Sequence, residues 1–114
     1  MSPITTHVLD TSKGRPAQGV TVLLEKAAQG GSWERLAGGS TNADGRIAEL
    51  LPKDSTLAKG LYRMTFGTGA YFKAQGTQGF YPSVIVVFEL TEPAAHYHIP
   101  LLLSPFGYST YRGS

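Results

Sequence analysis

The sequence predicts an all-β fold, namely an eight-stranded antiparallel sandwich with one short helix. Its 114 residues are 41% hydrophobic and 16% charged, and the 14 glycines and 7 prolines are typical of a chain with many turns. Short runs with apolar residues at alternate positions recur between turn signals, which is the pattern of strands that bury one face. A chain of this length forms one core, so we expect a single domain over residues 1–114.

The first two strands are predicted at residues 4–10 and 20–26. The first run alternates and ends at the turn cluster Thr11–Pro16, which contains a glycine and a proline as breakers. Alternate residues of a strand point to opposite faces, so His7 is expected on the face opposite Val8. The second run has valine and leucine at alternate positions and ends at a glycine-rich stretch.

A hairpin and a tight turn are predicted next. Residues 32–37 form a short third strand that returns along the second. Asn42–Gly45 is expected as a tight turn, because its Asp-Gly pair suits positive φ. The turn leads into an expected fourth strand, Arg46–Leu51, which places Arg46 at the mouth of that strand.

The middle of the chain is predicted to add two strands and the only helix. Residues 61–66 alternate as a fifth strand, after a polar loop. Thr68–Gly76 lacks period-two alternation and ends in a glycine suited to a helix C-terminus, so we expect the one short helix there. Residues 83–90 are rich in β-branched and aromatic side chains and predict the clearest strand of the chain.

The last nineteen residues, 96–114, predict two strands joined by a Ser-Pro turn. His96 and His98 share one strand face, while the apolar residues that alternate with them form a core face. Pro100 lies within this strand and cannot donate to a ladder, which predicts an edge strand or a bulge. The final strand, Tyr108–Arg112, would be a bare edge in a monomer, so we expect it to pair with another subunit.

Composition and charge exclude several classes of function. The net charge of +2 is small and the lysines are scattered, so we expect no nucleic-acid partner. No apolar run approaches spanning length, so we expect no membrane partner. The absence of cysteine excludes disulfides, cysteine-ligated zinc and thiol nucleophiles. The first residues resemble no export signal, and we expect a cytoplasmic location.

The three histidines permit a metal site as one alternative. His96 and His98 lie on one strand face, and His7 would supply a third ligand, as in open zinc sites with three histidines. No carboxylate or cysteine is positioned by the sequence to strengthen this site, and His96 fits a solvated residue at the start of a strand equally. We therefore expect no metal, with a metal-dependent hydrolase kept as an alternative.

A second constellation consists of His7, Arg46, His98 and Arg112, all on predicted strands. Imidazole and guanidinium groups that converge would suit a planar, polar, anionic small molecule and a hydrolytic step that needs a general base. Taken alone, a histidine on a strand is most often a surface or hydrogen-bonded structural residue, and an arginine after an Asp-Gly turn is most often exposed. A serine-hydrolase reaction is not indicated, because the sequence has no Gly-x-Ser-x-Gly elbow.

Several motifs spread over nearly the whole chain are distinctive in combination. They are Thr6–Asp10 with Gly14 and Pro16, Asn42–Arg46, Tyr71–Ala74, Phe80–Pro82, His96–Pro105 and Tyr111–Ser114. Together they resemble the 5-hydroxyisourate hydrolases, the transthyretin-related enzymes, and the closing tetrapeptide separates these enzymes from the hormone carrier.

The resemblance implies both an assembly and a reaction. It implies an eight-stranded sandwich that pairs edge to edge into dimers and face to face into a homotetramer, a dimer of dimers, with active sites in the channel between dimers. It implies hydrolysis of 5-hydroxyisourate to 2-oxo-4-hydroxy-4-carboxy-5-ureidoimidazoline, in the oxidation of urate to allantoin, without a cofactor. A transthyretin-like binding module without catalysis is the alternative within the same fold.

The resemblance also implies the residues of the site. The catalytic set would be His7, Arg46, His98 and Ser114, and the substrate-binding set would be Tyr111, Arg112 and Gly113. In our hypothesis His98 activates the attacking water with help from His7, and either histidine could be the base. Arg46 and Arg112 would hold substrate oxygens and stabilise the oxyanion, while Tyr111 and Ser114 orient the substrate. His96 is expected to lie outside the site.

Overall fold

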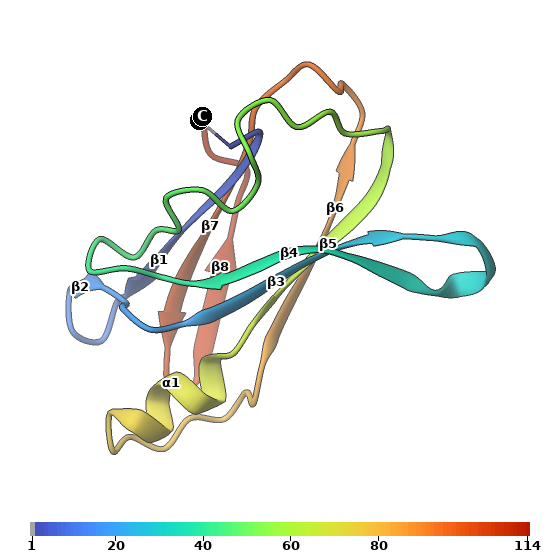
Figure 1. The fold of residues 1–114 in the computed structure, drawn as a ribbon. Helices are drawn as coiled ribbons and strands as arrows, with labels where there is room; N and C mark the ends of the chain where they lie inside the picture. The colour runs from blue at the N-terminus through green and yellow to red at the C-terminus, as the bar shows by residue number, and fades with distance from the viewer. Residues whose placement is uncertain (1) are drawn as a thin grey trace.

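The structure, a computed structural model, describes residues 2–114 as two four-stranded sheets packed face to face with a short helix at one end (Figure 1). The predicted all-β fold with eight strands and one short α-helix is confirmed. The elements are β1 (Ile4–Asp10), β2 (Arg15–Pro16), β3 (Thr21–Ala27), the 3-10 turn η1 (Gln29–Gly31), β4 (Trp33–Ser40), β5 (Gly60–Phe66), α1 (Thr68–Ala74), β6 (Val84–Leu90), β7 (Tyr97–Ser104) and β8 (Gly107–Thr110).

The strand order is β2-β1-β7-β8 in one sheet and β4-β3-β5-β6 in the other. The expectation that every pair is antiparallel needs one correction, because β1 and β7 run parallel from Ile4 opposite Tyr97 to Asp10 opposite Leu103. The other strand pairs of residues 2–114 are antiparallel. Parallel pairing needs a long connection. The whole second sheet lies between β1 and β7 in the chain and supplies one.

The expected fourth strand at Arg46–Leu51 does not form, and only Arg46 makes a β-bridge. The edge of β1 beyond that bridge is occupied by β2, a two-residue strand in the segment expected to be loop. The alternation in residues 46–51 therefore finds no ladder partner. Leu50 and Leu51 are both buried instead, since their segment folds as a turn over the core.

The predicted helix forms at Thr68–Ala74, and a single 3-10 turn forms in addition at Gln29–Gly31. That turn joins β3 to β4, where Gly30 and Gly31 adopt φ of 77° and 78°. Strand β4 begins one residue later than expected and continues to Ser40. Within residues 2–114, every helix is too short or too polar to cross a membrane.

Pro100 lies in a central strand, which corrects the expectation of an edge strand or a bulge there. Strand β7 is flanked by β1 and β8. The chain pairs Leu101 with Thr110 and, in the same register, His98 with Gly113, but it forms no strand between them. Alternate antiparallel pairs exchange hydrogen bonds. In this register Pro100 faces Tyr111, and the two occupy a position where hydrogen bonds would be exchanged. Proline has no N–H to donate, so β8 is interrupted there.

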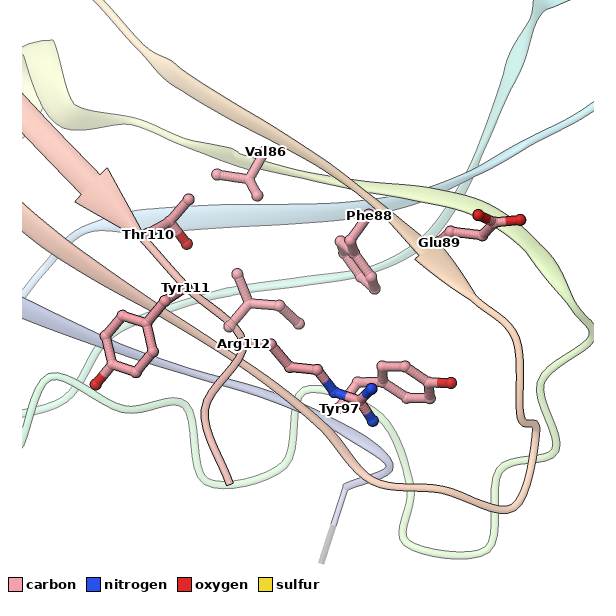
Figure 2. A pocket seen from close by; sticks show the side chains of 8 residues that line it. Val86, Phe88, Glu89, Tyr97, Thr110, Tyr111 and Arg112 are labelled. Atoms are coloured by element: carbon pink, nitrogen blue, oxygen red, sulfur yellow. The ribbon is translucent and has the colours of Figure 1, made fainter.

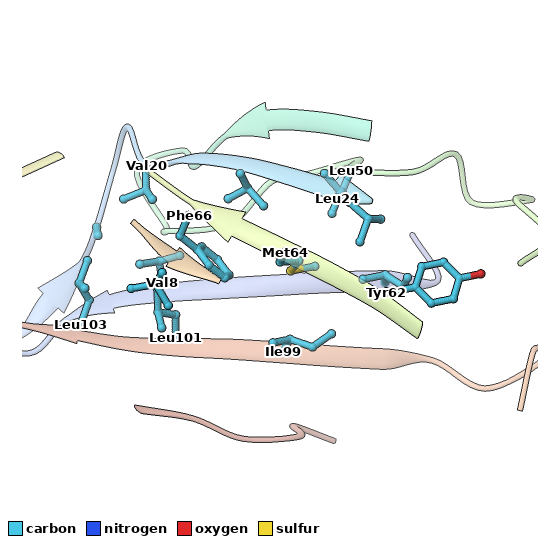
Figure 3. Packing of buried hydrophobic residues seen from close by; sticks show 14 of the residues in the cluster. Val8, Val20, Leu24, Leu50, Tyr62, Met64, Phe66, Ile99, Leu101 and Leu103 are labelled. Carbon is cyan, nitrogen blue, oxygen red and sulfur yellow. The ribbon is translucent and has the colours of Figure 1, made fainter. Parts of the chain in front are cut away.

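The core lies between the two sheets and is built from alternate residues of the central strands. Figure 3 shows side chains of β3 and β5 directed toward those of β1 and β7. The burial of β1 alternates from Ile4 to Asp10, as predicted. Burial of large aliphatic and aromatic side chains is the main stabilising term for such a sandwich. The largest fully buried members include Tyr62, Phe66, Leu24, Met64 and Leu101.

A buried carboxylate ties α1 to the end of β1. Oδ1 of Asp10 accepts hydrogen bonds from Oγ and N of Ser12, at 2.6 and 3.1 Å, and from N of Lys13 at 3.2 Å. Its Oδ2 accepts a bond of 2.7 Å from the Tyr71 hydroxyl. Burial alone raises the pKa of Asp10, but these hydrogen bonds together lower it. Burial and the bond to Asp10 raise the pKa of Tyr71 to about 12.

We expect Tyr71→Phe to lower the free energy of unfolding at pH 7 by about 1.5–3 kcal/mol, the usual range for a hydrogen bond to a charged group. Because the folded pKa of Asp10 is lowered, its stabilisation is present above the unfolded value near 3.9 and is lost as pH falls through the folded value. The difference from wild type should therefore shrink at pH 3 in urea unfolding. Tyr62→Phe is the control, because that hydroxyl donates to the neutral carbonyl of Ala58. A Tyr71→Phe effect independent of pH would contradict the ionic account.

Candidate active site

His7 and His98 lie on the outer face of the sheet that contains β1 and β7. In the parallel register Thr5 is opposite His98 and His7 is opposite Pro100, so the two histidines are diagonal neighbours on adjacent strands. Both histidines are half-buried. Their neighbours along the chain, Thr6 and Val8 in β1 and Tyr97 and Ile99 in β7, are buried on the core side. The predicted convergence of these two residues is thereby present within one chain.

Arg46 reaches this face through the turn that precedes it. Oδ1 of Asn42 accepts hydrogen bonds from N of Asp44 at 2.9 Å and N of Arg46 at 3.1 Å. Arg46 forms an antiparallel bridge with His7, and the Gly45 carbonyl accepts a 2.8 Å bond from N of Val8. The turn predicted from sequence therefore serves to fix Arg46 against β1, although no strand follows it.

We expect Gly45→Ala to displace this turn. Gly45 has φ 74°, and a Cβ there would lie 2.4 Å from the Val8 carbonyl oxygen and 3.3 Å from the His7 ring. A left-handed alanine costs roughly 1–2 kcal/mol; the backbone clash adds to this and moves Arg46. Gly14→Ala is the control, because its φ is 66° and no atom lies within 4 Å of the added Cβ.

Unfolding curves of the Gly45→Ala and Gly14→Ala variants, together with rates of the hydrolysis expected from the sequence, separate strain from displacement. Gly14→Ala should show only the cost of the left-handed backbone and keep its activity. Gly45→Ala should lose more stability and most of its activity. Equal behaviour of both variants would show that the contact between Gly45 and Val8 does not position Arg46.

The C-terminal segment packs against His98. N of Gly113 donates a hydrogen bond of 2.8 Å to the His98 carbonyl. A Cβ on Gly113 would lie 2.5 Å from Cδ2 of His98 and 3.3 Å from Cγ of Pro100, so only glycine fits this approach. Ser114 follows directly and is exposed. Figure 1 shows this end of the chain beside the start of β1.

The surroundings of His98 favour its neutral form. Burial lowers its pKa from the ordinary value of 6.5, and the charges of Arg46, His96 and His7 lower it further. A backbone hydrogen bond with Thr5 raises it by a smaller amount. His98 is therefore neutral at pH 7 and can accept a proton, while Arg46 supplies a permanent positive charge beside it.

Arg112 and Tyr111 lie apart from this group. The guanidinium carbon of Arg112 is 4.5 Å from the centre of the Tyr97 ring (Figure 2). Tyr97 precedes His98 in β7 and lies on the opposite, buried face. This arginine lines a groove of about 260 Å³ between β6 and the end of β8, with Val86, Phe88, Glu89, Tyr97, Ile99, Thr110 and Tyr111. Tyr111 is 57% exposed at its rim. The chain thus brings together His7, Arg46, His98 and Gly113, but not Arg112.

Thr5 is a site residue that the sequence analysis did not single out. Its Oγ1 lies 2.8 Å from Nδ1 of His98 and 3.0 Å from Nε2 of His96. The sequence did contain a signal for it, because Thr5 lies two residues from His7 and therefore shares its face of the strand. His96 itself is exposed, as expected, but it contacts the site through Thr5.

The arrangement of possible ligands does not favour a metal ion. Within residues 2–114, no three His, Cys, Asp or Glu side chains are grouped so as to hold an ion. His96 and His98 instead stack, with ring centroids 6.4 Å apart and planes inclined by 16°. The arrangement is one of a neutral imidazole with an arginine beside it on an outer sheet face.

Known proteins match this chain over almost its whole length. The profile of the HIUase/Transthyretin family matches residues 4–113. A mouse protein named 5-hydroxyisourate hydrolase is 47% identical over 114 residues, which cover 99% of this chain and 96% of the relative. The structure of Klebsiella pneumoniae 5-hydroxyisourate hydrolase has a TM-score of 0.83 and 41% identity, covering 97% of this chain and 98% of that one.

A transthyretin also shares the fold. Sea bream transthyretin in complex with thyroxine has a TM-score of 0.90 and 36% identity, covering 97% of this chain and 94% of the other. Backbone shape therefore does not separate hydrolases from transthyretins. The match to the family over residues 4–113 establishes that this chain belongs to the HIUase/Transthyretin family.

Proposed function

We propose that this chain hydrolyses 5-hydroxyisourate to 2-oxo-4-hydroxy-4-carboxy-5-ureidoimidazoline, a step in the degradation of urate to allantoin. The observation that carries the proposal is the convergence of His98, Arg46 and His7 on one outer sheet face, with the pKa of His98 lowered. Relatives named 5-hydroxyisourate hydrolase are 46–47% identical to this chain and support the same reaction.

The reaction is hydrolysis of a cyclic amide. The oxygen of a water molecule bonds to the ring carbonyl carbon while Nε2 of His98 takes the water proton. Negative charge develops on the carbonyl oxygen, and the guanidinium of Arg46 stabilises it. The carbon–nitrogen bond then breaks, and the proton held by His98 passes to the ring nitrogen. The reaction adds one water molecule across the carbon–nitrogen bond, so it requires no redox change and no cofactor.

The remaining site residues complete the proposal. His7 lies beside Arg46 and would position the water or relay a proton. Ser114 follows Gly113 at the His98 ring and would orient the substrate. Tyr111 and Arg112 are proposed as substrate-binding residues. Because the Arg112 guanidinium stacks on Tyr97 within the chain, such a role requires a site on another subunit or a change in its side chain.

We propose a homotetramer, a dimer of dimers, as the working assembly. Strands β6 and β8 are sheet edges that flank the groove of Figure 2, and an unpaired edge favours pairing with a second copy. The face that carries His98 is open and needs a cover to exclude water. Light scattering at micromolar concentration should give the mass of four chains, whereas a stable monomer would contradict this assembly.

The test of function follows the ultraviolet absorbance of freshly generated 5-hydroxyisourate with and without the protein. Decay should accelerate in proportion to protein concentration, and Arg46→Ala should lower kcat/KM by a hundredfold or more, about the loss seen when an oxyanion contact is removed. Decay at the spontaneous rate with folded wild-type protein would contradict the proposal.

The similarity to sea bream transthyretin supports a second candidate, a module that binds a ligand without catalysis. Such a protein would bind the substrate or its product and leave the decay unchanged. A metal-dependent hydrolase would instead lose its activity on dialysis against a chelator and contain stoichiometric metal. A cytoplasmic location stays a prediction, which cell fractionation would check.

A further inference from the structure

The hydroxyl of Thr5 lies between two imidazole rings. Its Oγ1 is 2.8 Å from Nδ1 of His98 and 3.0 Å from Nε2 of His96. The strand register places Thr5 directly opposite His98, and the two rings stack nearly parallel. The fold therefore holds one oxygen against one nitrogen of each ring.

A threonine hydroxyl has one proton to donate and two lone pairs that accept. Both distances are those of hydrogen bonds. The hydroxyl can donate to only one of the two rings, so the other ring must carry its own proton on the nitrogen that faces Thr5. The direction in which the Thr5 hydroxyl donates therefore depends on the tautomers of His96 and His98.

His98 is the ring better placed to donate. It is half-buried, whereas His96 is exposed, so its ring nitrogens are open to water. Nδ1 of His98 is the nitrogen that faces the Thr5 hydroxyl, so Nε2 is the nitrogen left to take the water proton in the proposed reaction. A neutral imidazole that accepts at Nε2 carries its own proton on Nδ1, so His98 donates to Thr5.

We propose that Thr5 is a positioning residue that holds His98 in the tautomer protonated at Nδ1. Its hydroxyl accepts the Nδ1–H of His98 and donates its own proton to Nε2 of His96. This leaves the lone pair of the His98 Nε2, the nitrogen beside the Cδ2 edge where Gly113 packs, free to accept a proton. The link between the two tautomers follows from this geometry, while the choice of Nδ1 as the protonated nitrogen of His98 rests on the proposed hydrolysis.

The same contact acts during the reaction. When Nε2 of His98 takes a proton from water, the ring becomes a cation that keeps its Nδ1–H bond to Thr5. The base then needs no rotation between accepting the proton and returning it to the ring nitrogen of the substrate. Fixing the tautomer and orientation of a catalytic histidine is a known source of large rate effects.

The experiment measures the tautomer and the kinetics separately. Nitrogen-15 NMR of the histidine rings at neutral pH, assigned with His98→Asn, should show His98 protonated at Nδ1 in the wild type. Thr5→Val keeps the β-branched shape suited to a strand but removes the hydroxyl. It should shift His98 toward the Nε2-protonated form and lower kcat about tenfold with little change in KM, because fewer molecules hold the competent tautomer. Thr5→Ser should restore both.

Thr11→Val is the matched control, since that hydroxyl bonds the Leu103 carbonyl at the other end of the same strand pair. It should leave the tautomer and kcat unchanged. A wild-type His98 protonated at Nε2, or a folded Thr5→Val variant with wild-type kcat, would overturn the role of Thr5 even if hydrolysis is normal. An inactive wild type with His98 protonated at Nδ1 would instead overturn the proposed function and leave the tautomer assignment standing.

Discussion

His98→Asn is expected to lower kcat/KM for 5-hydroxyisourate by roughly 10²–10⁴-fold, the usual contribution of a general base. Asparagine keeps a polar side chain on β7 but cannot take a proton at neutral pH. The backbone pairing of this residue with Thr5 and Gly113 does not depend on the side chain, so the unfolding curve should change little. Initial rates and urea unfolding on the same preparation check both statements.

His96→Asn is the control for that substitution, because His96 lies directly before β7, stacks on the His98 ring and is exposed. Its loss should cost less than about tenfold, since Thr5 can donate to water in place of the ring. Similar losses from both variants would mean that neither histidine acts specifically as the base, and a wild-type rate for His98→Asn would remove His98 from the mechanism.

The pH dependence has a defined sign. Burial and the positive charge of Arg46 lower the pKa of His98 below 6.5, and His96 and His7 act in the same direction. The ring therefore stays neutral to a lower pH than an ordinary histidine, and kcat/KM should be level above pH 6.5 and fall below it. In Arg46→Lys the positive charge remains, so the inflection should stay below 6.5, whereas Arg46→Ala should move it upward.

Gly113→Ala is expected to be nearly as damaging as removal of residues 111–114. The added Cβ would lie 2.5 Å from Cδ2 of His98, so the ring or the terminal segment must move. A misplacement of this size near a reacting atom costs on the order of a hundredfold in rate. The truncated chain loses the hydrogen bond from Gly113 to His98 as well, and should hydrolyse substrate barely above the spontaneous rate.

Two controls separate the possible causes. Gly107→Ala adds a methyl group to β8 with only an ordinary contact of 3.7 Å to Ser104, and should leave activity unchanged. Arg112→Ala removes a guanidinium from the groove beside Tyr97 without touching the His98 ring. A large loss from Arg112→Ala in intact tetramers would support its role in a site on another subunit. Full activity of the truncated chain would contradict any role for the C-terminus.

Local sequence was sufficient to predict seven of the eight expected strands, their faces and the turn, but not the absence of a strand at 46–51 or the presence of β2. Alternation placed His7 and His98 away from the core, and both are half-buried on the outer face. The Asp-Gly pair predicted the turn that carries Arg46, and Gly45 has φ 74° there. These features depend on residues close in the chain, whose side-chain period and backbone preferences act before any long-range pairing.

Pairing and register were decided only by the tertiary structure. Alternation in residues 46–51 predicted a strand, but β2 occupies the edge that it would need. The parallel register of β1 and β7 places Thr5 between two histidines that lie 91 and 93 residues away in the chain. The break in β8 opposite Pro100 directs Arg112 toward Tyr97 and Gly113 toward His98. Side-chain period determines the face of a strand, whereas its neighbours follow from competition among non-local contacts, which the sequence does not display.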